Sequence, residues 1–122
     1  LGGQVLDLLL ACAEERLADM SVNWADDHAL TVVMASKGYP GSYRKGTPIS
    51  GLEGLSETSF AMTFHAGTAT GNGHVIATGG RVLACTGRGA TLAEAHQRAY
   101  AQVDAIDWPE GFCRRDIGWR AL

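Results

Sequence analysis

Hydrophobic residues recur at every third or fourth position near both ends of the chain. Over residues 4–20 the apolar positions, Val5 and Leu9 among them, share one side of a helical wheel, and we predict a helix there. The same spacing predicts a second helix over residues 91–106, which Trp108-Pro109 ends. The C-terminal tail that follows is too short for an assignment.

The middle of the chain instead holds short apolar runs separated by turn residues, a pattern typical of strands. The predicted strands cover residues 29–36, 59–66 and 81–87. Residues 67–80 predict a hairpin with Asn72-Gly73 at its tip, because Asn-Gly favours the tight type I′ turn. Residues 37–57 are too irregular for regular structure and predict a long loop. The fold class expected is α+β, a mostly antiparallel sheet with helices packed on one face.

The stretch "TGRGATLAEAHQRAY" (86–100) raises the possibility of a dinucleotide-binding turn, since a predicted strand and two closely spaced glycines precede a predicted helix. The full fingerprint needs a third small residue, where this chain has Leu92. It also needs a second parallel strand ending in an acidic residue, whereas Asp107 follows the helix with no strand between. The pattern therefore disfavours a free-standing nucleotide binder.

A simpler interpretation of this stretch is a capped turn. Thr91 and Glu94 have the spacing of a capping box, in which two side chains satisfy N–H groups at the start of a helix. Gly87 and Gly89 are then expected to supply the unusual φ values of a short turn from strand to helix.

Composition narrows the function classes. The net charge of −3 and the pI near 5.7 disfavour nucleic-acid binding, and no apolar run approaches the length of a membrane helix. The cysteines, Cys12, Cys85 and Cys113, form no C-x-x-C pair and are predicted to be buried free thiols in a reducing cytoplasm.

The remaining chemistry-bearing residues form no recognised motif. The histidines lack the spacing of a zinc site, and a pair of Ser36 or Ser50 with a histidine has no supporting motif. The adjacent carboxylates Glu14-Glu15 and Asp26-Asp27 are expected to be solvated. From composition and spacing alone, we expect a soluble α+β domain whose function these features do not specify.

Several stretches, taken in order, resemble one enzyme family. The stretches are "LTVVMASKGYPG" (30–41), "GTPISGLE" (46–53), "FHAGT" (64–68), "GGRVLACTGRGATLAEAHQRAY" (79–100) and "FCRRDIGWRAL" (112–122). Together they resemble the C-terminal domain of glycinamide ribonucleotide synthetase, also called phosphoribosylamine–glycine ligase, an ATP-grasp ligase of purine biosynthesis. Residues 28–122 are identified with that domain. Residues 1–27 resemble the terminal helix and linker of the ATP-grasp domain before it, so we expect a longer parent polypeptide.

The resemblance implies an activity for the parent protein. That family joins glycine to 5-phosphoribosylamine while ATP is cleaved to ADP, with Mg²⁺ or Mn²⁺ at the phosphates. The family's acidic metal motif, R-F-G-D-P-E, belongs upstream of residues 1–122, so no catalytic residue or metal ligand is expected here and the chain alone is expected to be inactive. The expected partners are the upstream ATP-grasp and N-terminal domains of a cytoplasmic, monomeric enzyme.

Candidate substrate contacts follow from the same resemblance. By analogy with related ATP-grasp enzymes, Gly79, Gly80 and Arg81 are expected to hold the ribose phosphate, since a close-approaching backbone and a guanidinium suit an anion. His65, Gly67 and Thr68 are the next candidates.

Each candidate also has a structural interpretation. Arg81 then stands solvated at a β-bulge, and His65 is a satisfied residue at a strand end. Tyr39 serves packing only, and Arg114, Arg115 and Asp116 form a salt-bridge cluster that docks the tail, the interpretation we favour for that cluster. The alternative for the whole chain is a non-catalytic binding module of similar fold.

Overall fold

Two antiparallel sheets and one long helix form the body of the protein after residue 27. The computed structural model describes residues 2–55 and 57–122, so Leu1 and Ser56, which fall in the predicted first segment and long loop, lie outside the described residues. The larger sheet has the order β3-β6-β1-β7, and the smaller has the order β2-β5-β4. The strands are β1 (His28–Ser36), β2 (Thr47–Ile49), β3 (Ala61–His65), β4 (Thr68–Gly71), β5 (His74–Ala77), β6 (Arg81–Gly89) and β7 (Gly111–Phe112).

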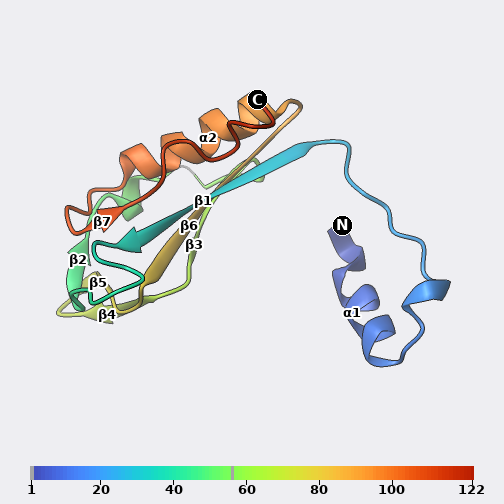
Figure 1. Cartoon of the computed structure of the whole chain (residues 1–122), viewed down its shortest axis with the longest axis horizontal. Coiled ribbons are helices and arrows are strands. Elements are labelled where there is room, and N and C mark those ends of the chain that lie inside the picture. Colours follow the sequence, from blue (N-terminus) through green and yellow to red (C-terminus); the bar gives the residue numbers. More distant parts are fainter. Residues whose placement is uncertain (1, 56) are drawn as a thin grey trace.

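Helix α2 (Leu92–Ala105) covers one face of the larger sheet (Figure 1). Its buried face meets alternate residues of β1 and β6, because successive side chains of a strand point to opposite faces. The core formed in this way includes Val32, Met34, Leu83, Cys85, Ala95, Ala99 and Val103. The strands of both sheets pair antiparallel, which confirms the predicted α+β fold.

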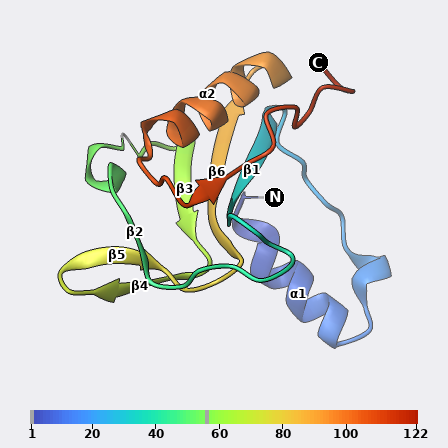
Figure 2. The same cartoon turned by 60° about the vertical axis from the view of Figure 1, so that its left-hand side comes forward.

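The N-terminal helix is shorter than predicted. Helix α1 (Val5–Ala13) stops well before Met20, because Glu15 adopts a φ of 58°, in the left-handed region that breaks a right-handed helix. A short 3₁₀ turn, Leu17–Asp19, follows. In Figures 1 and 2, α1 lies on the side of the larger sheet away from α2, and no α1 residue joins the core cluster.

The hairpin prediction is confirmed and the long-loop prediction is partly wrong. Asn72 and Gly73 have φ values of 52° and 79°, as a type I′ turn between β4 and β5 requires. Inside the predicted loop, however, strand β2 pairs with β5. Trp108 also donates a hydrogen bond to the buried hydroxyl of Thr47, at 3.0 Å. These partners lie far away in the sequence, so local composition does not indicate the strand.

The capped start of α2 is confirmed. The Thr91 hydroxyl accepts a hydrogen bond from the Glu94 backbone N–H at 3.2 Å, and the Glu94 carboxylate accepts one from the Ala90 N–H at 3.0 Å. In a standard capping box the Glu94 carboxylate would accept from the N–H of the N-cap residue, Thr91; here it accepts from the N–H of the preceding residue, Ala90. The strand after α2 is β7, which pairs antiparallel with β1, so the parallel unit of a dinucleotide fold is absent from the described residues.

The role predicted for Gly87 and Gly89 is wrong. Neither has a positive φ, and both are buried residues of β6. A Cβ atom on Gly87 would stand 2.2 Å from the Ala95 carbonyl oxygen and 2.6 Å from the Ala99 nitrogen. Glycine is therefore required at residue 87 because α2 lies directly on the strand backbone.

The cysteines differ in burial, which corrects one prediction. Cys12 is exposed, because it lies on α1 away from the core, whereas Cys85 is fully buried between the sheet and α2. Burial raises the pKa of the Cys85 thiol and, with less cover, that of Cys113. Cys85 is therefore an unreactive core residue.

Two adjacent carboxylate pairs were expected to be solvated, and each has a paired member. Asp27 accepts a hydrogen bond from Arg88 at 2.7 Å, which lowers the pKa of that carboxyl, and Glu14 is paired with Arg16.

Among the described residues, no helix has both the length and the apolar character needed to cross a membrane.

Candidate functional site

All the predicted substrate-binding residues lie in one corner of the molecule, where the chain passes between the two sheets. The β3–β4 connection carries Gly67, and the β5–β6 connection carries Gly79. The Gly67 carbonyl accepts hydrogen bonds from the N–H groups of Thr78 and Gly79, at 2.8 and 3.1 Å. A Cβ on Gly67 would stand 2.6 Å from the Arg81 carbonyl oxygen. The two glycines therefore let the connections cross in contact.

Arg81 is held beside Tyr39 in this corner. A Cβ on Gly80 would stand 2.2 Å from the nearest carbon of the Tyr39 ring, so the ring packs directly against the glycine backbone. The Arg81 guanidinium donates a hydrogen bond to the Tyr39 hydroxyl at 2.6 Å, and its carbon lies 5.6 Å from the centre of the ring. Tyr39 thus positions the arginine, a role that the packing-only interpretation did not include.

Ser36 fixes the Gly79-Gly80 connection from the end of β1. Its hydroxyl donates to the Gly79 carbonyl at 2.9 Å, and its backbone N–H donates to the Gly80 carbonyl at 2.8 Å. The register between β1 and β6 shifts next to this point, between Met34 and Ala35. Ser36 is thus a buried structural residue, and sequence reasoning missed its link to the corner.

His65 and Thr68 flank Gly67 at the surface. The His65 Nδ1 atom and the Thr68 hydroxyl lie 2.9 Å apart and share a hydrogen bond. Both groups belong to the corner, and their pairing fixes the His65 ring at the end of β3. Ser50, the other serine considered, instead pairs its backbone with Asp107.

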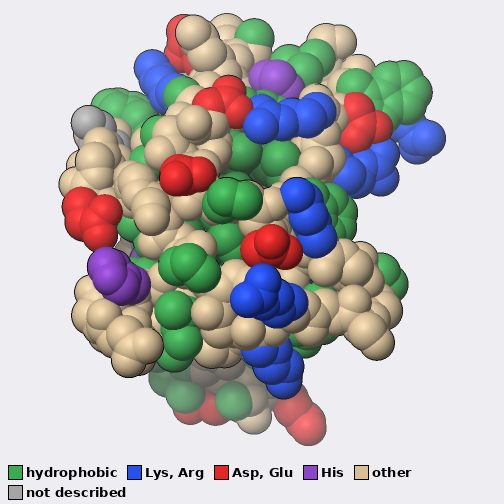
Figure 3. Space-filling model, turned by 90° about the vertical axis from the view of Figure 1, so that its left-hand side faces the viewer, with side chains coloured by type: hydrophobic (Ala, Val, Ile, Leu, Met, Phe, Trp, Pro, Cys, Tyr) green, Lys and Arg blue, Asp and Glu red, His purple; other side chains and the backbone are tan. Residues whose placement is uncertain are grey.

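The sequence segments that form the corner carry basic but no acidic side chains, although Glu110 of the tail lies next to Lys37 and Arg88, at the far end of β6, is paired with Asp27. Residues 28–52 and 58–93 contain no Asp or Glu, and their basic side chains are Lys37, Arg44, Lys45, Arg81 and Arg88. Figure 3 looks onto the end of the molecule that carries the smaller sheet, and Lys and Arg side chains gather along one side of that face, with some acidic side chains among them. Within residues 2–55 and 57–122, no carboxylate forms an ion pair with Arg81. Its charge is thus open to an anion.

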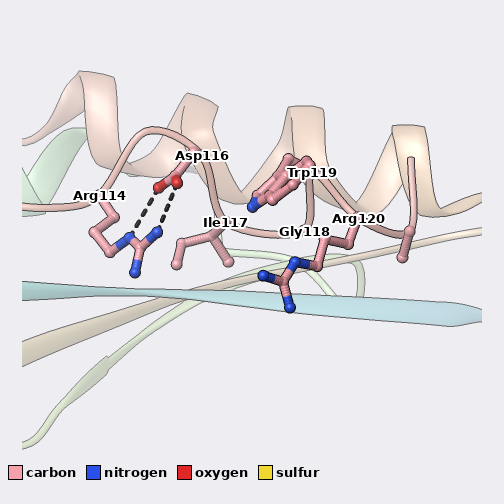
Figure 4. Close-up of a pocket in the computed structure, with 7 residues that line it drawn as sticks. Arg114, Asp116, Ile117, Gly118, Trp119 and Arg120 are labelled. Atoms are coloured by element: carbon pink, nitrogen blue, oxygen red, sulfur yellow. Dashed lines mark hydrogen bonds and ion pairs between the residues drawn. The ribbon is translucent and has the colours of Figure 1, made fainter.

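A second group of arginines lies in the C-terminal tail. Arg114 makes two hydrogen bonds to Asp116, at 2.8 and 2.6 Å, and Figure 4 shows the two side chains turned toward each other. This pairing lowers the pKa of the Asp116 carboxyl. A shallow hollow of about 380 Å³ lies beside them, lined also by Trp119 and Arg120.

The tail cluster docks the tail, as expected. Arg115 forms an ion pair with Asp104 of α2 at 2.5 Å, and the Tyr100 hydroxyl donates to the Arg114 carbonyl at 2.8 Å. The Ile117 N–H in turn donates to the Tyr100 hydroxyl at 3.2 Å. These contacts tie residues 114–117 to α2.

Nowhere in residues 2–55 and 57–122 do three His, Cys, Asp or Glu side chains come together as a metal site would need.

Comparison with known proteins places the chain in a family. A family model described as "Phosphoribosylglycinamide synthetase, C domain" matches residues 29–120. The chain is 53% identical over 97% of its length to a protein from Mesorhizobium japonicum named phosphoribosylamine–glycine ligase. It is 46% identical over 97% of its length to a protein of that name from Escherichia coli K12. It spans 28% of the length of each of these relatives.

A solved structure agrees with the sequence relatives. The crystal structure of phosphoribosylamine–glycine ligase from Thermotoga maritima matches with a TM-score of 0.70 at 32% identity, over 89% of this chain and 27% of that chain. The fold, the matched residues and the identities all point to the same family. The chain belongs to the phosphoribosylglycinamide synthetase C-domain family.

Proposed function

We propose that this chain is the C-terminal part of a phosphoribosylamine–glycine ligase, which joins glycine to 5-phosphoribosylamine with cleavage of ATP to ADP in purine biosynthesis. The observation that carries the proposal is the family match over residues 29–120, together with relatives of that name at 46% to 53% identity. The alternative, a non-catalytic binding module, is not favoured because these relatives match nearly the whole chain.

The corner around Arg81 is the proposed contact with the sugar phosphate. The Arg81 guanidinium is exposed, is paired with no carboxylate of the described residues, and is held on one side by Tyr39. It is therefore suited to a charge-assisted hydrogen bond to a phosphate oxygen. Because Gly79 already donates its N–H to Gly67, the guanidinium is the principal donor and the two glycines serve to place it. His65 and Thr68 lie next to it as further polar groups.

The rest of the reaction belongs, in this proposal, to the preceding domains of the same polypeptide. ATP and Mg²⁺ or Mn²⁺ bind there and supply phosphoryl-transfer chemistry, and the 122-residue chain helps to close the substrate pocket. The chain carries a buried core of its own, which fits the role of a covering domain. We propose a monomeric cytoplasmic enzyme.

Growth complementation tests the proposal. Expression of the whole gene that encodes this chain is expected to restore growth without purines to a bacterial strain that lacks phosphoribosylamine–glycine ligase. Expression of the 122-residue chain alone is expected to leave the strain dependent on purines. Failure of the whole gene, expressed as folded protein, to restore growth would reject the proposed function.

Helix α1 provides a test of the domain boundary that needs no substitution. Nearly every residue of Val5–Ala13 is apolar, and a helix that is apolar on all sides is normally buried. We propose that residues 1–27 pack into the preceding ATP-grasp domain. Alkylation of Cys12, exposed in this chain, is then expected to be at least about tenfold slower in the whole polypeptide. Buried Cys85 serves as a control that stays unreactive in both, and equal Cys12 rates would contradict the boundary.

A further inference from the structure

The face of the larger sheet that α2 does not cover carries exposed apolar side chains and two threonines that pair with each other. The register places Phe64 of β3, Ala84 of β6 and Val33 of β1 side by side in one row across three strands. All three side chains point away from α2, because their neighbours in sequence face it. Val32 and Leu83 belong to the core, and Thr63 donates a hydrogen bond to Gln102 of α2 at 3.3 Å. Phe64 is 50% exposed and Val33 is 42% exposed. These are large apolar groups in a position that a covered sheet would bury.

The next row on this face is also suited to burial. It consists of Met62, Thr86 and Thr31 in register. The two threonine hydroxyls lie 2.8 Å apart and share a hydrogen bond, which lowers the cost of removing them from water. Met62 is 39% exposed, and its flexible side chain adapts to an irregular partner surface.

The edge of this face is hollowed. A depression of about 260 Å³ is lined by residues 58–62 and by Phe64, Thr86 and Arg88. Its walls are mainly apolar, with Arg88 at one side. A contiguous apolar face with a polar border is the pattern of an interaction surface rather than of scattered surface residues.

The position of α1 indicates what covers the face. In Figures 1 and 2, α1 lies on the same side of the sheet as this surface. The link to α1 is anchored at the border of the surface, because Asp27, which precedes β1, is paired with Arg88 at 2.7 Å. The relatives carry over two-thirds of their length outside the matched part, and this chain spans 28% of them.

We propose that the preceding part of the same polypeptide, rather than a second copy of the chain, docks on the free sheet face formed by Val33, Met62, Phe64, Ala84 and Thr86. The docking rests on the proposed function, since that function supplies the preceding domains. The apolar side chains of the two rows contribute the buried contact, and the Asp27–Arg88 pair fixes where the linker meets the face. The corner with Arg81 then has a defined orientation toward those domains.

Cysteine labelling tests the docking. Met62→Cys is introduced into the whole polypeptide, with Gln97→Cys on the exposed side of α2 as the matched control. Alkylation with iodoacetamide is followed at each cysteine by peptide mass spectrometry, so the native thiols do not interfere. We expect the cysteine at 62 to react at least about tenfold more slowly than the cysteine at 97. In the 122-residue chain alone, we expect both to react rapidly.

Three results would overturn the docking. They are equal rates at 62 and 97 in the whole polypeptide, slow reaction at 62 in the 122-residue chain alone, and protection that grows with protein concentration, which would place a second copy on the face. Ligase activity, measured on the unmodified polypeptide, separates the two proposals. Protection at 62 without ligase activity would reject the proposed function and support the docking, whereas activity with equal labelling rates would do the reverse.

Discussion

Gly87→Ala is expected to destabilise the fold by about 3 kcal/mol, at the upper end of the usual range for overpacking a core. The added Cβ would stand 2.2 Å from the Ala95 carbonyl oxygen and 2.6 Å from the Ala99 nitrogen. Both are backbone atoms of α2, so the whole helix must move away from the sheet, and contacts such as Cys85 with the helix loosen with it. The melting temperature should fall by roughly 10 °C or more, as measured by circular dichroism.

Gly54→Ala is the matched control for this substitution. Apart from its chain neighbours, no atom of the described residues lies within 4 Å of a Cβ added at Gly54, and its φ is not positive. Its replacement is expected to change the free energy of unfolding by less than about 0.5 kcal/mol. Similar melting temperatures for the two variants would show that the packing of α2 does not require a residue without a side chain at position 87.

Arg81→Ala in the whole polypeptide is expected to raise the KM for phosphoribosylamine selectively. A hydrogen bond to a charged group contributes roughly 1.5–3 kcal/mol. At about 1.4 kcal/mol per tenfold, the expected rise is about tenfold to a hundredfold. The KM values for ATP and glycine should change little, because those ligands are proposed to bind the preceding domains. Steady-state kinetics with each substrate varied in turn measures this.

Two further variants sharpen the test. Arg81→Lys is expected to restore only part of the loss, because lysine keeps the charge and gives up the planar fork that also contacts Tyr39. Arg115→Ala is the control, since Arg115 is paired with Asp104 and is assigned to docking the tail. Equal changes in all three KM values for Arg81→Ala, or none, would remove the phosphate role.

Local sequence signals predicted the elements whose causes are local. The Asn72-Gly73 turn depends on two residues that accept positive φ, and the start of α2 depends on Thr91 and Glu94. The strands also followed from short apolar runs. Helix α1 was predicted too long because its apolar spacing continues past Glu15, where the backbone takes a left-handed conformation.

The features that sequence reasoning missed depend on distant partners. Strand β2 is held by β5 and by Trp108. Gly87 is required because α2 packs against the strand there and leaves no room for a side chain, not because its φ is unusual. The corner was predicted from family resemblance, but its construction from Tyr39 and Ser36 was not. The absence of acidic residues from 28–52 and 58–93 is a signal in the sequence that could have linked Arg81 to the loop before β2.

The central claim is that this chain works as one domain of a ligase, and product formation tests it most directly. The whole polypeptide and the 122-residue chain are each purified and supplied with phosphoribosylamine, glycine, ATP and Mg²⁺, and glycinamide ribonucleotide is followed by mass spectrometry. We predict product from the whole polypeptide, dependent on all three substrates, and none from the chain alone. No product from a folded whole polypeptide, or product from the 122-residue chain by itself, would contradict the claim.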